Sequence, residues 1–199
     1  IVELQSRFSI RAFNVYGPTE CTVNSTLTLI EGVYPHIGQP LPYANATIWS
    51  GIQLLPDGAV GELCITGGGV TLGYLNKPEV NKKHFCSNPF NPSKKLYRTG
   101  DLARKRKIGE QTVIEYIGRN DDQIKLRGYR IELGEIKYQI DAIPSVSESF
   151  VKIAGTGDTA QIVAYISWAP EANQNVEQLD LTLATKLPSY MIPTSYIAV

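Results

Sequence analysis

The sequence predicts an α+β fold, in which a mostly β, barrel-like part precedes a small α+β unit. Up to about Arg119 it consists of short β-rich runs between turn signals, with the period-two alternation of half-buried strands. After Leu133, apolar residues recur at helical spacing. The charged stretch 120–122 separates these two textures and is a candidate hinge. The predicted division is therefore 1–119, 120–122 and 123–199.

The first part contains a series of predicted strands. "SIRAFNVYG" closes at a Gly-Pro turn, and "CTVNSTLTLI" alternates polar with apolar residues. "ATIWSGIQLLPDGAVGELCIT" predicts two strands around a Pro-Asp-Gly turn, which favours a tight reversal. A glycine-rich connection, "GGGVTLGYLNKPE", leads to further strands in "LYRTGDLARK" and "TVIEYIGR".

The second part mixes strands and helices. "QIKLRGYRIE" predicts a strand pair around Gly128, and "ESFVKIAG" and "QIVAYISW" predict a strand, a turn and a strand. A helix that Pro144 ends has apolar residues at helical spacing: Leu133, Ile136, Ile140 and Ile143. A second amphipathic helix is marked in the same way by Val176, Leu179, Leu183 and Leu187.

Composition excludes several classes of protein. The 199 residues are 43% hydrophobic and 19% charged, as in ordinary globular proteins. The 19 basic and 19 acidic residues cancel, which argues against a nucleic-acid binder. No apolar run approaches the ~20 residues of a membrane span, and the N-terminus has no signal-peptide pattern. We expect a cytoplasmic protein without membrane association, and we interpret the chain, which lacks an initiator Met, as part of a longer one.

Metal and disulfide chemistry are not indicated. Cys21, Cys64 and Cys86 are far apart, form no Cys-x-x-Cys pair and accompany only two histidines. A zinc site is therefore not expected, and the three thiols are expected to be reduced.

Each motif alone has two interpretations. The Thr19–Glu20 pair after a rigid Tyr-Gly-Pro turn fits a capped hairpin, or a site where Thr binds a phosphate oxygen and Glu holds a cation. Asp101 in "YRTGD" fits a carboxylate that accepts backbone hydrogen bonds in a turn. "GRNDDQIKLRGYRIE" fits a solvated edge strand.

Together the motifs are more specific. "NVYGPTE", "GELCITGGGVTLGYLNKPE", "LYRTGDLARK", "GRNDDQIKLRGYRIELGEI" and "LPSYMIP" follow one another in this order along nearly the whole chain. The chain resembles the adenylate-forming (AMP-binding) enzyme superfamily, and most closely the amino-acid-activating adenylation domains of non-ribosomal peptide synthetases. The match covers that family's fifth to ninth core motifs.

The resemblance implies an ATP-dependent ligase. A carboxylate attacks the α-phosphate of ATP, and the acyl group of the acyl-adenylate then passes to the phosphopantetheine thiol of a carrier domain. ATP, Mg²⁺ and an amino acid are the implied ligands. A peptidyl carrier domain and a condensation domain, in the same or a partner chain, are the implied partners. Residues 1–119 would be the C-terminal part of the large AMP-binding subdomain, and 123–199 the mobile lid, incomplete at its end.

The resemblance also implies roles for single residues at the nucleotide. Gly17 belongs to the nucleotide-binding turn, Thr19 hydrogen-bonds the α-phosphate and Glu20 holds Mg²⁺, a hard cation that prefers oxygen ligands. Asp101 accepts both ribose hydroxyls, which suits an ionised carboxylate.

Four further positions belong to the implied nucleotide site. Tyr16 lies against the adenine and Asn14 hydrogen-bonds the adenine amino group. Arg119 reaches the ribose and phosphate region. Tyr116 borders the nucleotide, or is an aromatic residue of sheet packing.

The remaining implied roles concern the substrate and the lid. The pocket positions of the family that fall in this chain are Val15, Val23 and Asn24, which do not name an amino acid. Asp121 is the expected hinge. Lys125 and Gly128 line the pantetheine path, with Lys125 also acting in catalysis, or they are a surface lysine and a bulge glycine.

Two parts of the family pattern do not occur in this sequence. The Ser/Thr/Gly-rich phosphate loop precedes these motifs in the family, and the Gly-Lys pair whose lysine contacts the substrate carboxylate follows them. We therefore expect residues 1–199 alone to have no adenylation activity.

Alternative functions remain open at this stage. An acyl- or aryl-CoA ligase of the same superfamily uses free coenzyme A, although the motifs favour the peptide-synthetase branch. A non-catalytic scaffold or docking piece has no positive sequence signal. An RNA-binding β module would use "KLRGYR" with Tyr129 as a stacking aromatic residue, and the neutral net charge disfavours it.

Overall fold

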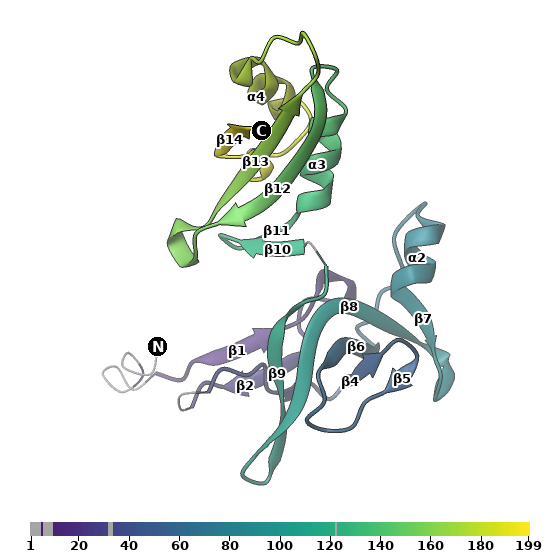
Figure 1. Ribbon diagram of the computed structural model, residues 1–199. Coiled ribbons are helices and arrows are strands. Elements are labelled where there is room, and N and C mark those ends of the chain that lie inside the picture. Colours follow the sequence, from purple (N-terminus) through teal and green to yellow (C-terminus); the bar gives the residue numbers. More distant parts are fainter. Residues whose placement is uncertain (1–4, 6–9, 32–33, 122) are drawn as a thin grey trace. The chain divides into compact units, whose positions relative to one another are not determined.

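The chain consists of two compact units. A computed structural model (Figure 1) describes residues 5, 10–31, 34–121 and 123–199, and its contacts divide it into Ile1–Asn120 and Asp121–Val199. Strands dominate both units and helices are few, which confirms the α+β prediction.

The first unit begins with a small antiparallel sheet of strand order β1-β2-β3. Its strands are β1 (Phe13–Tyr16), β2 (Thr26–Leu29) and β3 (Gln39–Pro40), and η1 (Thr19–Cys21) lies between the first two. The strand predicted in "CTVNSTLTLI" is only partly present. Thr22 and Val23 adopt left-handed φ angles of 59° and 69°, so the chain is still turning there.

A larger sheet follows, of order β5-β4-β6-β8-β7 with β9 paired to β8. Its strands are β4 (Ala44–Ser50), β5 (Gln53–Leu54), β6 (Gly61–Gly67), β7 (Phe85–Asn88), β8 (Asn91–Ile108) and β9 (Gln111–Arg119). Within the described residues both sheets are open and no closed barrel forms, so the barrel-like expectation gives way to two open sheets. A bridge between Gly38 and Ile114 joins the segment before β3 to β9.

One core fills the first unit. Tyr16 and Cys21 from the first sheet region pack with buried residues of the larger sheet: Ala46, Ile48, Leu63, Ile65, Tyr97, Ala103 and Ile114. Because β1 and β8 contribute to the same core, residues at the end of β1 are held beside the middle of β8.

Two elements of this unit were not predicted. The Pro-Asp-Gly turn connects β5 to β6, because the chain reverses first at Gly51–Ile52 into the short strand β5. Helix α2 (Pro78–His84) begins at a proline, which is favourable in the first turn of a helix. It buries none of its residues, so it has no apolar periodicity for a sequence to reveal.

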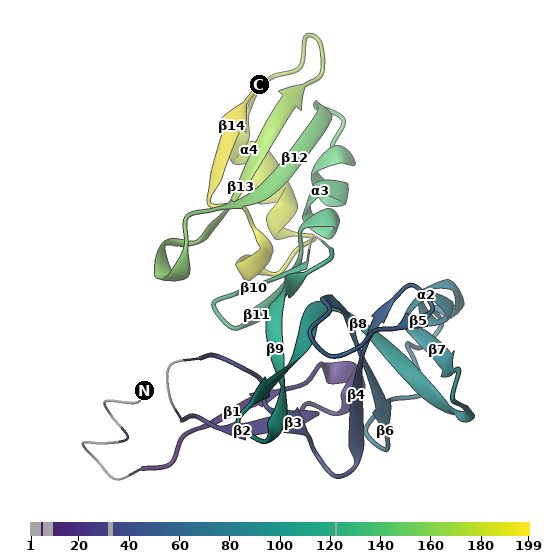
Figure 2. The ribbon, with the colours of Figure 1, turned by 60° about the horizontal axis from the view of Figure 1, so that its bottom comes forward.

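The second unit joins a hairpin, two helices and a mixed sheet (Figure 2). The elements are β10 (Gln123–Leu126), β11 (Tyr129–Glu132), α3 (Leu133–Asp141), β12 (Val146–Ala154), η2 (Gly157–Thr159), β13 (Gln161–Trp168), α4 (Val176–Ala184), η3 (Ser189–Met191) and β14 (Ser195–Ala198). Both predicted helices and the predicted strand pairs are present. β14, which pairs in parallel with β13, was not predicted.

Turn and cap chemistry fix the ends of these elements. Arg127 and Gly128 form the β10–β11 turn with φ angles of 51° and 84°, the pattern of a type I′ hairpin turn. The Asn175 side chain accepts a hydrogen bond of 2.9 Å from the Gln178 amide and so caps α4. Both helices pack on one sheet face, where Ile136, Ile140, Leu179 and Leu183 meet Val151, Ile162, Ala164 and Ile166.

The three cysteines are free thiols. Burial raises the pKa of Cys21 to about 12 and also raises the pKa of Cys64, so both stay protonated and unreactive near neutral pH. No described helix is both long enough and apolar enough to cross a membrane.

The separate core of the second unit leads to a stability prediction. Ile140 is 0% exposed, and Ile140→Ala is expected to destabilise this unit by about 3 kcal/mol through lost burial and a cavity. Hydrogen–deuterium exchange should accelerate in peptides from 123–199 and stay unchanged in 34–120. Tyr138→Ala, on the same helix but at a side chain 70% exposed, is the control and should change neither. Equal acceleration in both units would contradict independent cores.

Candidate functional site

The Tyr-Gly-Pro-Thr-Glu motif folds into a tight turn directly after β1. Two backbone hydrogen bonds, of 2.9 and 3.1 Å, close η1. Gly17 has no room for a side chain, because a Cβ there would lie 2.3 Å from the Val23 carbonyl oxygen. The turn leaves Thr19 exposed and buries Glu20, so adjacent residues present a hydroxyl and a carboxylate in different environments.

Asp101 lies in the middle of β8 and is 4% exposed. The Tyr16 hydroxyl donates to its Oδ2, and the Arg119 guanidinium donates to its Oδ1 at 2.7 Å. Arg119 also donates to the Thr99 carbonyl at 3.2 Å. Three elements, β1, β8 and β9, thus meet at one buried carboxylate, which has a charged partner as burial requires.

The Tyr16–Asp101 bond does not depend on pH over the ordinary range. Burial first, and then the neighbouring Asp101 charge, raise the pKa of the Tyr16 phenol well above its usual value. The hydroxyl therefore keeps its proton and stays a donor.

A local irregularity of β8 places Asp101. The pairing of β8 with β6 shifts register between Glu62 and Cys64, and Gly100 has a φ of 74°. The Glu62 carboxylate accepts from the Gly100 amide at 3.1 Å and forms an ion pair with Arg98. Glu62 thus holds both sides of the bulge.

Thr99 completes the same bulge. Its hydroxyl donates to the Leu63 carbonyl at 2.7 Å and accepts from the Asp101 amide at 3.0 Å. The backbone directly before the Asp101 side chain is therefore fixed from two directions.

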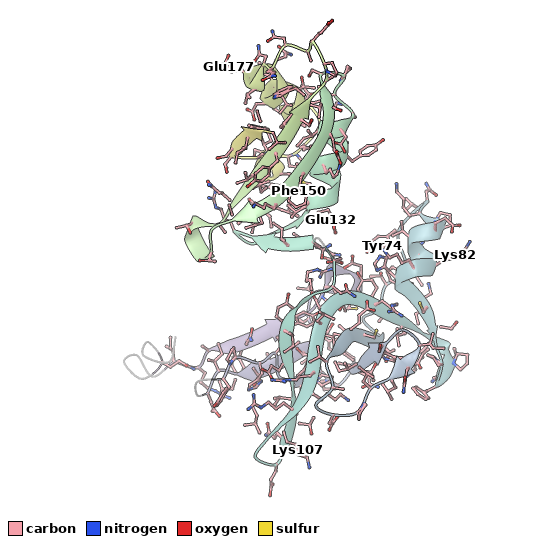
Figure 3. The ribbon with its side chains drawn as sticks, viewed as in Figure 1. Tyr74, Lys82, Lys107, Glu132, Phe150 and Glu177 are labelled. Atoms are coloured by element: carbon pink, nitrogen blue, oxygen red, sulfur yellow. The ribbon has the colours of Figure 1, made fainter. Side chains whose placement is uncertain are left out.

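The Glu20 side chain has a phenol partner. The Tyr74 hydroxyl donates to Glu20 Oε1, and Figure 3 labels Tyr74 beside α2. The connection that carries Tyr74 is bound to η1 through its backbone, since the Thr71 amide donates to the Glu20 carbonyl at 2.9 Å and the Thr22 hydroxyl donates to the Gly69 carbonyl at 2.7 Å.

The other predicted positions of the first unit are arranged around these two carboxylates by strand geometry. On β1, Asn14 and Tyr16 share one face and Val15 points to the other. The Asn14 side-chain nitrogen donates to the His36 carbonyl at 2.8 Å. Tyr116, on β9 opposite Ala103, is partly exposed.

The pocket candidates lie at the surface of this unit. Val15 is exposed, Val23 is 65% exposed and Asn24 is exposed. The Asn24 carbonyl accepts from the Tyr43 hydroxyl at 2.9 Å, which ties its backbone to the segment before β4.

The predicted lid residues belong to the second unit and are described within it. Asp121 Oδ1 accepts from the Gln123 amide at 3.2 Å, so it begins the strand β10. Lys125 lies on β10 opposite Arg130, and Gly128 occupies the hairpin turn.

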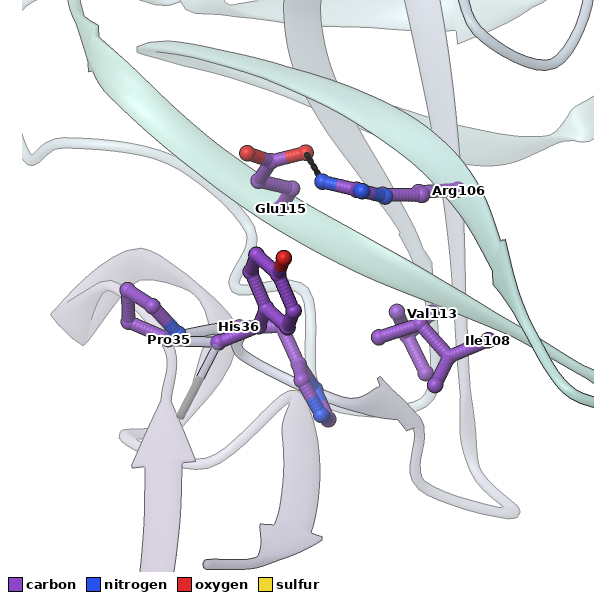
Figure 4. Close-up of a pocket in the computed structure, with 7 residues that line it drawn as sticks. Pro35, His36, Arg106, Ile108, Val113 and Glu115 are labelled. Carbon is purple, nitrogen blue, oxygen red and sulfur yellow. Dashed lines mark ion pairs between the residues drawn. The ribbon is translucent and has the colours of Figure 1, made fainter. Parts of the chain in front are cut away.

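A small pocket in the first unit is not this site (Figure 4). Its volume of about 20 Å³ is enough for about one water molecule. Arg106 and Glu115 form an ion pair of 3.6 Å at its edge. None of the predicted site residues lines it; its lining is Tyr34, Pro35, His36, Arg106, Ile108, Val113 and Glu115.

Comparison with known proteins agrees with the motifs. Residues 2–75 match the family model described as AMP-binding enzyme. The chain is 45% identical over 196 residues to one plipastatin synthase polypeptide, and 43% identical over 198 residues to surfactin synthase subunit 2, both from Bacillus subtilis (strain 168). These matches cover 94% and 97% of the chain. The chain belongs to the AMP-binding enzyme family.

A solved structure gives the same assignment. NpsA-ThdA, an artificially fused adenylation–PCP di-domain from Klebsiella oxytoca, superimposes with a TM-score of 0.76 at 28% identity, over 94% of this chain and 35% of that chain. The chain spans only 7% and 5% of the length of the two Bacillus synthases.

The carboxylates present fit the Mg²⁺ that such enzymes use with ATP. Among the described residues, no three His, Cys, Asp or Glu side chains gather around a possible metal position. Glu20 therefore offers a single carboxylate. Mg²⁺ is commonly held in this way, by one or two carboxylates together with substrate phosphates and water.

Sequence reasoning missed two residues of this arrangement. Glu62 is a carboxylate within a strand whose neighbours are all buried, which is a signal for a paired charge. Tyr74 has no comparable signal, because its contact with Glu20 spans 54 positions of sequence.

The role of Glu62 can be tested by stability. Glu62→Ala leaves the Gly100 amide and Arg98 without their partner, and is expected to cost about 2 kcal/mol in the first unit. Glu62→Gln keeps an acceptor for Gly100 and is expected to cost about 1 kcal/mol. Thermal unfolding measures both. Glu79→Ala, which breaks an exposed ion pair with Lys82, is the control and should change nothing measurable. Equal losses for Ala and Gln would leave no role for the Gly100 bond.

Proposed function

We propose that this chain is part of an amino-acid-activating adenylation domain of a non-ribosomal peptide synthetase. The reaction is the attack of an amino-acid carboxylate on the α-phosphate of ATP, which forms an aminoacyl-adenylate and releases pyrophosphate. The aminoacyl group then passes to the phosphopantetheine thiol of a carrier domain. The observation that carries the proposal is the buried Asp101 carboxylate held by Tyr16 and Arg119, in a chain whose relatives are named as peptide synthases.

Asp101 would bind the ribose. Each of its oxygens accepts one hydrogen bond within the protein and has a second acceptor position left for a ribose hydroxyl. Asn14 uses its amide nitrogen on His36, which orients its amide oxygen as an acceptor for the adenine amino group. Tyr16 would border the adenine, with Tyr116 at the nucleotide edge and Arg119 toward the ribose and phosphates.

The turn after β1 would serve the phosphates. The exposed Thr19 hydroxyl donates to an α-phosphate oxygen, and Gly17 allows the turn to close tightly enough to present it. Glu20 would hold Mg²⁺, which when bound neutralises charge on the phosphates. Both residues act by position and charge, which is how proteins promote transfer at phosphorus.

The rest of the reaction needs the substrate pocket, the lid and partner domains. Val15, Val23 and Asn24 would line part of the amino-acid pocket. In the second unit Asp121 would be the hinge, and Lys125 and Gly128 would line the pantetheine path, with Lys125 acting in the second step. A peptidyl carrier domain and a condensation domain are the proposed partners.

ATP–pyrophosphate exchange on the full-length protein tests the proposal. The protein is given panels of amino acids, aryl acids and fatty acids. Exchange with one or a few amino acids is the expected result. Exchange with aryl or fatty acids alone would instead assign the chain to a CoA-ligase branch, and no exchange with any acid would contradict an adenylating function.

Asp101→Asn gives a sharper prediction in the same assay. It removes the charge that accepts the ribose hydroxyls, a loss of about 1.5 kcal/mol, so the KM for ATP should rise about tenfold. The KM for the amino acid should stay unchanged, because Asp101 does not line that pocket. Asp57→Asn, in the turn between β5 and β6, is the control. A rise in both KM values together would contradict a role specific to the nucleotide.

A further inference from the structure

The connection from β6 to α2 does more than join two elements. Residues 68–77 cross η1 and are bound to it by the backbone bond of Thr71 to Glu20 and by the hydroxyl bond of Thr22 to Gly69. Gly69 approaches so closely that a Cβ there would lie 2.9 Å from the Cys21 carbonyl oxygen. The connection is therefore seated on the turn that carries Glu20.

Asn81 of α2 fixes one residue of this connection. Its side-chain oxygen accepts from the Tyr74 amide at 2.7 Å, and its side-chain nitrogen donates to the Tyr74 carbonyl at 2.8 Å. Gly73 permits this approach: its φ is 133°, and a Cβ there would lie 2.8 Å from Asn81 Oδ1. One amide side chain thus satisfies both backbone groups of Tyr74.

The Tyr74 ring is also fixed. It meets Phe85 edge to face, with ring centroids 5.5 Å apart and planes at 79°. Its hydroxyl lies 3.5 Å from the Tyr97 hydroxyl and donates to Glu20 Oε1. Backbone, ring and hydroxyl each have a partner, so the phenol presents its proton to one oxygen of Glu20 in a set direction.

We propose that Tyr74 is a positioning residue for the Glu20 carboxylate, and that Asn81 acts through Tyr74. The inference rests on the proposed function, in which Glu20 holds the cation that accompanies ATP. A phenol that binds Oε1 sets the rotation of the carboxyl group, and with it the direction in which the carboxylate meets the cation. Hydrogen bonds of this kind orient metal-binding carboxylates, and their loss typically costs 10- to 100-fold in metal affinity or activity.

Tyr74→Phe tests the proposal, because it removes the hydroxyl and keeps the ring. Binding of Mn²⁺ to the full-length protein is measured by electron paramagnetic resonance with α,β-methylene-ATP, which cannot react at the α-phosphate. Mn²⁺ affinity is expected to fall about tenfold. In pyrophosphate exchange, the Mg²⁺ concentration for half-maximal rate should rise by a similar factor, with the KM for the amino acid unchanged.

Asn81→Ala is the second variant. It removes both bonds to Tyr74 without touching Glu20, and is expected to weaken Mn²⁺ binding in the same direction. A purely structural role for either residue would lower the thermal midpoint and leave Mn²⁺ affinity as in the unmodified protein.

Tyr196→Phe is the matched control. Tyr196, in the second unit, also donates from a phenol to a carboxylate, Asp180 Oδ1, at 2.7 Å. Its loss should leave Mn²⁺ binding unchanged. Unchanged Mn²⁺ affinity in Tyr74→Phe would overturn the positioning role. Absence of exchange by the unmodified protein, with Mn²⁺ binding still dependent on Tyr74, would instead overturn the proposed function and support the positioning role.

Discussion

The buried charge of Asp101 is the constraint on which the first unit depends. A carboxylate removed from water is stable only with a charged or hydrogen-bonding partner for each oxygen. Tyr16 and Arg119 supply these partners from β1 and β9, and Asp101 itself lies on β8 between them. One interaction thus specifies how the small sheet, the long hairpin and the core residue Tyr16 come together.

The same constraint explains the irregular backbone of β8. A regular strand would alternate its side chains without a break, whereas the register shift opposite Glu62 and the positive φ of Gly100 turn the chain locally. Glu62 and Thr99 supply the hydrogen bonds that this departure from the ladder requires. A second buried carboxylate, paired with Arg98, therefore supports the first.

Local patterns predicted much of the fold, and long-range contacts account for most of what they missed. Helices α3 and α4 have buried residues at helical spacing, and the β10–β11 hairpin has a glycine where a positive φ is needed. Thr22 and Val23 are β-branched and favour a strand, yet tertiary contacts around Gly17 hold them in left-handed turns. The motifs indicated Asp101 and Glu20 as candidates, whereas the Tyr74–Glu20 contact depends on how the β6–α2 connection crosses η1.

The pleat of β1 separates two chemical tasks within one short strand. Tyr16 is buried against Asp101 and Asn14 shares its face, while Val15 is exposed on the opposite face. If the proposed roles hold, nucleotide contacts come from one side of the strand and a substrate contact from the other. Position 15 is then free to change with the amino acid that is activated, because the hydrogen bonds of Asp101 do not pass through it. Tyr16, by contrast, is tied to both the core and the carboxylate, so its replacement would disturb the nucleotide site in any member with this arrangement.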